Sequence, residues 1–267
     1  MRRERVAAVV LRQLYLMRGS AARVTPLFAW VAVDIVLWGF LSRYLGEVAG
    51  SGHLFVPTLL GAVLFWDFFT RVMHGVTMAF FEDVWARNFL NLFSTPLTVS
   101  EYLAGLVLCS MATSAVGLGA MLAVSTAVFG LSFAPYGAAA VPFLLVLLLF
   151  GVALGVTGAA LVLRLGPAAE WFIWPVPALV APFAGVFYPL SVLPGWMRAV
   201  GRCLPPSYVF EALRALVAGG RVSWMGLAGS AALAGVYVAA ACGVFSRTWR
   251  YGIRTGLIAR YSAESVG

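Results

Sequence analysis

The chain has 267 residues, of which 62% are hydrophobic and only 10% are charged. Soluble domains carry roughly 45–50% apolar and about 25% charged residues, so this composition excludes a soluble fold and predicts that much apolar surface faces lipid. The net charge is +8, and all the basic residues are arginine. Because a P-loop and a Schiff base each need a lysine, the chain can carry out neither chemistry.

Six apolar segments are long enough to cross a bilayer, which takes about 20 residues. They are residues 24–41, 54–76, 102–129, 141–163, 171–188 and 224–245. The expected fold class is therefore an all-α integral membrane protein with six transmembrane helices, which occupies residues 24–247. No polar stretch is long enough to form a second domain.

The arginines indicate how these spans are oriented. With the N-terminus inside, the cytoplasmic segments would carry twelve of the eighteen arginines and the outside segments five, with Arg71 inside a span. An excess of arginine marks the cytoplasmic side, so both termini are predicted there. Residues 248–267 would then form a basic cytoplasmic tail.

Residues 1–23, ahead of the first span, alternate apolar and basic side chains. Val6, Val10 and Leu14 recur at helical spacing, with arginines between them. A basic amphipathic helix lying on the membrane surface is expected here. A solvated, partly frayed terminus is the alternative.

Residues 81–93 form a polar island between the second and third spans. A helix there would place Phe81 and Trp85 on an apolar face and Arg87 elsewhere. Such a helix can dock into the groove of a partner protein. From the residues alone, a simple connecting helix that lies among the lipid headgroups fits equally well.

Two further motifs concern helix boundaries and packing. Residues 98–101, Thr-Val-Ser-Glu, form a capping box that starts the third span. Small residues at Gly151, Gly155 and Ala159 in the fourth span would let another helix approach closely.

Prolines interrupt the fifth span at positions 175, 177 and 182. Proline removes a helical hydrogen bond and kinks the helix, so this span is expected to be broken. Residues 189–220 follow, with two short amphipathic segments. They are too polar to cross the membrane and too apolar to be fully exposed to water. We expect them to form an extracellular re-entrant hairpin.

Charges inside spans are candidates for function. Asp67 and Arg71 are four residues apart, which predicts a structural ion pair near the cytoplasmic surface. Asp34, midway along the first span, would be protonated, bonded to a neighbouring helix or facing a channel. The sequence contains no Gly-x-Ser-x-Gly or HExxH motif, and its two histidines and three cysteines are scattered. Neither a catalytic nor a metal site is therefore predicted.

Several segments together resemble a known family. They are WARNFLNLFSTPL at residues 85–97, EYLAG at 101–105, FAGVFYPL at 183–190, LPGW at 193–196 and LPP at 204–206. With the N-terminal helix, they are similar to the transmembrane subunits of type-2 ABC transporters, the exporter-type permeases. Within that family, these segments are most similar to the branch that exports drugs, lipids and oligosaccharides.

The resemblance implies a mechanism and a set of partners. Two such subunits, a homodimer or a heterodimer, would pair in a bacterial or archaeal inner membrane above two separate ATPase subunits, which would bind ATP and Mg²⁺. This chain would hold no cofactor, bind no nucleic acid and be no enzyme. It would move an amphiphilic drug, lipid, oligosaccharide or lipid-linked oligosaccharide outward by alternating access.

The resemblance also assigns roles to residues. Residues 81–93 would be the coupling helix, seated in the ATPase through Glu82, Asp83, Trp85, Arg87, Asn88 and Phe89. The outer gate and re-entrant hairpin would include Gly185, Phe187, Tyr188, Pro189, Pro194 and Trp196.

The path of the substrate is suggested by Asp34 and by aromatic residues on the second and fifth spans. These candidates are Asp34, Phe65, Trp66, Phe69 and Trp174. For the aromatic residues, packing against lipid is the alternative. The rival functions are a haem-delivery permease, a passive channel and an integral membrane enzyme. The last two would work without an ATPase partner.

Overall fold

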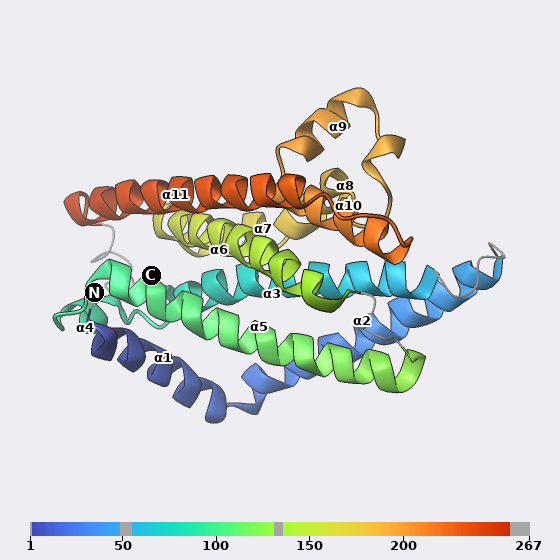
Figure 1. Cartoon of the computed structure of the whole chain (residues 1–267). Helices are drawn as coiled ribbons and strands as arrows, with labels where there is room; N and C mark the ends of the chain where they lie inside the picture. Colours follow the sequence, from blue (N-terminus) through green and yellow to red (C-terminus); the bar gives the residue numbers. More distant parts are fainter. Residues whose placement is uncertain (1, 49–54, 131–135, 257–267) are drawn as a thin grey trace.

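The computed structural model describes residues 2–48, 55–130 and 136–256, and this part of the chain contains helices and no strand. Figure 1 shows long helices lying side by side. The helices are α1 (Arg3–Arg18), α2 (Ala21–Val48), α3 (Phe55–Trp85), α4 (Phe89–Phe93), α5 (Val99–Phe129), α6 (Ala140–Leu165), α7 (Glu170–Ile173), α8 (Val176–Ala184), α9 (Gly195–Arg202), α10 (Pro205–Val217) and α11 (Trp224–Arg254). Short 3-10 turns occupy Gly137–Ala139, Gly166–Ala169 and Leu190–Val192.

Four helical stretches among the described residues are long and apolar enough to cross a membrane. They are Thr58–Trp85, Val99–Phe129, Gly137–Leu165 and Trp224–Arg254. They cover the third, fourth and sixth predicted spans and, from residue 58 onward, the second. The first predicted span lies within α2, and prolines divide the fifth between α7 and α8. The all-α membrane fold is confirmed, while the count of six spans stays a prediction.

The C-terminal ends of two predicted spans differ from the structure. Helix α3 continues to Trp85, well beyond the predicted end of the second span at residue 76. Helix α11 runs on to Arg254, so the first residues of the predicted tail are helical. Residues 257–267 of that tail, and residue 54 at the start of the second predicted span, lie outside the described residues.

Helix α3 lies at the centre of the bundle, where it contacts α2, α5, α6 and α10. Its side chains at Phe65, Phe69, Val72, Val76 and Phe80 are all buried. This spacing of three to four residues keeps them on one helical face. A central helix with such a face positions both ends of the bundle relative to each other.

The capping box at the start of α5 is confirmed. The Thr98 hydroxyl accepts a hydrogen bond from the Glu101 backbone N–H at 3.3 Å, and the Glu101 carboxylate accepts one from the Thr98 N–H at 3.1 Å. Two otherwise unpaired N–H groups are thereby satisfied at the first turn of the helix. The same carboxylate has a second role, described below.

The predicted close approach at the small residues of α6 is also confirmed. A Cβ added at Gly155 would lie 2.8 Å from the Met73 carbonyl oxygen of α3, so only glycine fits without a shift. The Thr77 hydroxyl uses this proximity to donate a hydrogen bond to the Gly155 carbonyl at 3.0 Å. The α3–α6 contact therefore depends on backbone meeting backbone.

The substitution Gly155→Ala should destabilise the bundle by about 1–3 kcal/mol, because the added methyl overpacks this contact. The measurement is the midpoint of thermal unfolding in detergent. Gly119→Ala in α5 is the matched control, since a Cβ there would meet no atom within 4 Å. Equal midpoints for the two variants would show that the α3–α6 contact is not tight.

Candidate functional site

Residues 81–93, predicted as a single helix, are two helical pieces joined by a turn. Helix α3 ends at Trp85, and Arg87 adopts a left-handed conformation with φ of 53°. The Asn88 N–H bonds to the Asp83 carbonyl at 3.1 Å, and the Arg87 N–H bonds to the Val84 carbonyl at 3.1 Å. This pair of bonds is a Schellman motif, which normally places glycine where Arg87 stands. Helix α4 begins after it.

The side chains of this turn divide into an outward and an inward set. Trp85 is 65% exposed, Arg87 is exposed, and Asn88 is partly exposed. Phe89 and Asp83 are buried, at 1% and 2% exposure. Of the six predicted coupling residues, the structure therefore brings Trp85, Arg87 and Asn88 to the surface, leaves Glu82 half-buried and turns Asp83 and Phe89 inward.

The buried Asp83 carboxylate joins three helices. The Arg12 guanidinium of α1 forms an ion pair with it through both terminal nitrogens, with Nη1 at 2.9 Å from Oδ2. The Tyr102 hydroxyl of α5 donates to the same Oδ2 at 2.6 Å. The hydrogen bond to Asp83 raises the pKa of Arg12, so this guanidinium stays charged. Asp83 therefore fastens α1 and α5 to the end of α3, and sequence reasoning gave no sign of Arg12 or Tyr102 as its partners.

A second buried carboxylate, Glu101, holds the start of α1. It accepts a hydrogen bond from the Arg2 backbone N–H at 2.7 Å and contacts the Arg5 guanidinium at 3.4 Å. Between the two carboxylates, Val9 of α1 packs so close to α5 that a Cβ at Gly105 would lie 2.6 Å from its Cβ. The predicted N-terminal helix thus packs against the first turns of α5, where its own first turns lie beside that helix (Figure 1).

Aromatic packing fixes helix α4 to the rest of the bundle. The Phe89 ring lies 5.2 Å from the ring of Phe80 in α3 and 6.3 Å from that of Tyr102 in α5. The Phe93 ring lies 4.7 Å from the ring of Trp249 in α11. Helix α4 is therefore packed through these rings against α3, α5 and α11.

A cavity of about 720 Å³ lies close to this end of the bundle, between residues of α1, α2, α3 and α5 together with Trp174. The Asp67–Arg71 ion pair forms part of its wall. Of the predicted path residues, Asp34 and Trp174 line it. Phe65 and Phe69 are instead buried in the core at 1% and 0% exposure, where Phe69 stacks on Phe150. Trp66 packs against Phe69 and Phe210.

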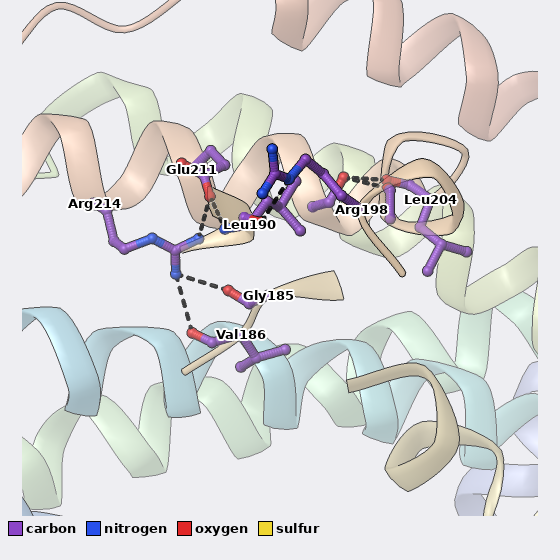
Figure 2. Close-up of polar contacts among 9 residues, drawn as sticks. Gly185, Val186, Leu190, Arg198, Leu204, Glu211 and Arg214 are labelled. Carbon is purple, nitrogen blue, oxygen red and sulfur yellow. Dashed lines mark hydrogen bonds and ion pairs between the residues drawn. The ribbon is translucent and has the colours of Figure 1, made fainter. Parts of the chain in front are cut away.

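The segment after α8 is organised by Arg214 of α10 (Figure 2). Its guanidinium donates to the Gly185 carbonyl at 2.7 Å and to the Glu211 carboxylate at 3.0 Å. Glu211 also accepts the Leu190 N–H at 2.7 Å. Gly185 has a φ of 62°, a conformation in which a side chain is strained. The chain therefore turns at Gly185, and α10 holds the turn.

Arg198 of α9 secures the next stretch by donating to the carbonyls of Leu190, Ser191 and Leu193 at 2.8–3.2 Å. The predicted gate residues lie on or beside this structure. Phe187 stacks on Trp38 of α2 at 4.8 Å, and the Tyr188 hydroxyl donates to the Pro182 carbonyl at 3.0 Å. Pro189, Pro194 and Trp196 are exposed. The position of this hairpin in the membrane stays a prediction.

A double-mutant cycle of Arg12→Ala and Asp83→Asn should give a coupling energy of about 1–3 kcal/mol, because removing Arg12 leaves a buried carboxylate without its charged partner. The measurement is unfolding of the purified chain in detergent. Arg3→Ala, an exposed arginine on the same helix, is the control and should couple to Asp83→Asn by less than about 0.5 kcal/mol. A coupling no larger than that of Arg3 would contradict the clamp.

Arg214→Gln should loosen residues 185–193, because it removes a charged donor from the carbonyls of Gly185 and Val186 and from the Glu211 carboxylate. Increased cleavage of this segment in limited proteolysis would report the change. Arg221→Gln, an exposed arginine just beyond α10, is the matched control and should leave the cleavage pattern unchanged. Protection equal to that of the unmodified chain would show that Arg214 does not hold the turn.

Comparison with known proteins adds one match. The family model of the ABC-2 type transporter matches residues 6–217, which cover the helices from most of α1 to the end of α10. No curated protein matches the chain. The family forms the transmembrane part of ABC transporters, a permease subunit that normally works with a separate ABC ATPase. Because the match extends over most of its length, the chain belongs to the ABC-2 type transporter family.

Proposed function

We propose that this chain is the permease of an ATP-driven exporter, with two copies pairing above two separate ATPase subunits in a bacterial or archaeal inner membrane. Both termini would lie in the cytoplasm, on the side of α1 and α4. The observation that carries the proposal is the α3–α4 turn. It presents Trp85 and Arg87 outward, while Asp83 and Phe89 attach it to the bundle.

The outward set suits a contact with a partner protein. A large exposed aromatic ring beside a guanidinium is the composition that dominates binding energy in protein interfaces. Asn88 and Asn91 extend this surface, since the Asn91 amide donates to the Asn88 side chain at 3.3 Å. We therefore assign direct contact with the ATPase to Trp85, Arg87 and Asn88, and an anchoring role to Asp83 and Phe89.

The inward set supplies the route by which the ATPase would move the bundle. ATP and Mg²⁺ would bind in the ATPase, and their chemistry would take place there. A push on Trp85 and Arg87 would pass to α1 through the Asp83–Arg12 ion pair. It would pass to α11 through the contact of Phe93 with Trp249. Charge-assisted bonds and packed rings transmit displacement because neither can stretch far without breaking.

The far end of the route would be the hairpin held by Arg214. Helix α10, which holds this hairpin, packs on α3, α6 and α11, and α3 ends at the α3–α4 turn. Rocking of these helices would reposition α10 and with it Gly185 and Glu211. Alternating access would then open the cytoplasmic side and the outer hairpin in turn. The transported substrate would be an amphiphile, because the cavity combines apolar and charged walls.

Trp85→Ala should weaken the association with the ATPase by about tenfold or more, as expected for an aromatic hot spot. The measurement is co-purification of the tagged chain with its co-expressed ATPase, followed by titration of the pure subunits. Trp224→Ala is the matched control, because Trp224 is a similarly exposed tryptophan, at 58%, in the first turn of α11.

The two outcomes separate the coupling surface from the fold. Loss of association only in Trp85→Ala, with an unchanged unfolding midpoint, supports the proposal. An ATPase that binds both variants equally would place the contact elsewhere. A chain that associates with no ATPase while remaining folded would return the passive channel and the membrane enzyme to consideration.

A further inference from the structure

The polar wall of the large cavity is incompletely satisfied. Six buried side-chain nitrogen or oxygen atoms among the described residues have no hydrogen-bond partner, and four of them belong to residues that line this cavity. They are Gln13 Nε2, Thr70 Oγ1, His74 Nε2 and Ser114 Oγ. Ser114 and Gln13 are only 1% and 5% exposed. Buried polar groups almost always have partners, so this concentration indicates that a polar ligand or water belongs in the cavity.

The charges on the wall indicate which ligand fits. Asp67 is engaged by Arg71 in an ion pair. Asp34 also lines the cavity, where the positive charge of Arg71, already paired with Asp67, attracts it as well. Two carboxylates thus share one guanidinium, and a second cation beside Asp34 would relieve the cost of the charge that Arg71 leaves uncompensated. The unused charge of the site is therefore negative.

The remaining lining is apolar and aromatic. Trp30 and Trp174 are 65% and 54% exposed, so an entering molecule can reach their ring faces. Met17 and Met78 add flexible apolar surface, and the Trp174 ring lies 4.7 Å from that of His74. Tryptophan faces attract cations as well as apolar groups, and methionine adapts to irregular shapes. The lining thus combines exposed aromatic rings with the carboxylates of Asp34 and Asp67 and the guanidinium of Arg71.

We infer that this cavity binds the head of an amphiphile that carries a protonated amine, with the ammonium at Asp34 and the apolar body against Trp30 and Trp174. The Thr70 and Ser114 hydroxyls can accept the other N–H bonds of the ammonium. The Gln13 amide can donate to a hydroxyl or carbonyl next to it. This inference rests on the proposed export function and names the class of substrate that the exporter would take.

The test uses the full chain in nanodiscs of zwitterionic lipid, with empty nanodiscs subtracted. The probes are a dansyl-labelled alkylamine and the same dansyl-alkyl chain ending in a hydroxyl. The alkylamine should bind more tightly, and Asp34→Asn should weaken it by about tenfold or more while leaving the hydroxyl probe unchanged. Glu47→Gln is the matched control, since it removes an exposed carboxylate from the same helix.

A second variant keeps the test decisive if Asp34→Asn lowers the yield of folded protein. Trp30→Ala alters an exposed ring and should weaken both probes. Equal affinity for the amine and the hydroxyl probe, or equal loss in Asp34→Asn and Glu47→Gln, would overturn the inference. Tighter binding of the hydroxyl probe would point instead to a neutral, hydroxylated head. Because binding is measured without the ATPase, failure of the coupling proposal would leave this result unaffected, and the reverse also holds.

Discussion

The arrangement of the bundle depends on how one buried carboxylate is neutralised. Asp83 lies at the end of a long apolar helix, where an unpaired charge would be strongly destabilising. Its partners come from two other helices, Arg12 of α1 and Tyr102 of α5. The chain thereby gains a rigid junction where it would otherwise have a frayed helix end. The aromatic packing of Phe89 on Phe80 and Tyr102 lies beside that junction.

The junction at Asp83 and the rings beside it hold the short helix α4 in a fixed position. Helix α4 has five residues and would not be stable alone, because helix formation needs a costly nucleus. It is held by rings from α3, α5 and α11. The exposed turn is thus the accessible part of a structure whose other members extend through the bundle. An interface built this way can be specific without being large, because its geometry is set before the partner arrives.

Hydropathy predicted the long helices because lipid exposure leaves a strong signal in composition. It could not predict that α3 continues to Trp85, since the polar residues near its end are satisfied by partners distant in sequence. Arg12 and Asp83 are 71 residues apart, and no spacing rule joins them. The turn at Arg87 could not be predicted, because the left-handed position of a Schellman motif is normally occupied by glycine and here it is an arginine. For the cavity, Asp34 and Trp174 were candidates, but only the fold shows that they share a wall and that Phe65 and Phe69 do not.

Helix α1 contributes to both the Asp83 junction and the cavity. Arg12 is held by Asp83, and the neighbouring Gln13 and Met17 line the cavity. A molecule that fits against Gln13 and Met17 therefore contacts the helix that is ion-paired to Asp83, next to the α3–α4 turn. Thermodynamic linkage is reciprocal: if engagement of the turn alters the affinity of the cavity, occupancy of the cavity must alter engagement of the turn by the same factor. Through α1, the presence of substrate in the cavity would then alter how tightly the proposed ATPase binds the α3–α4 turn.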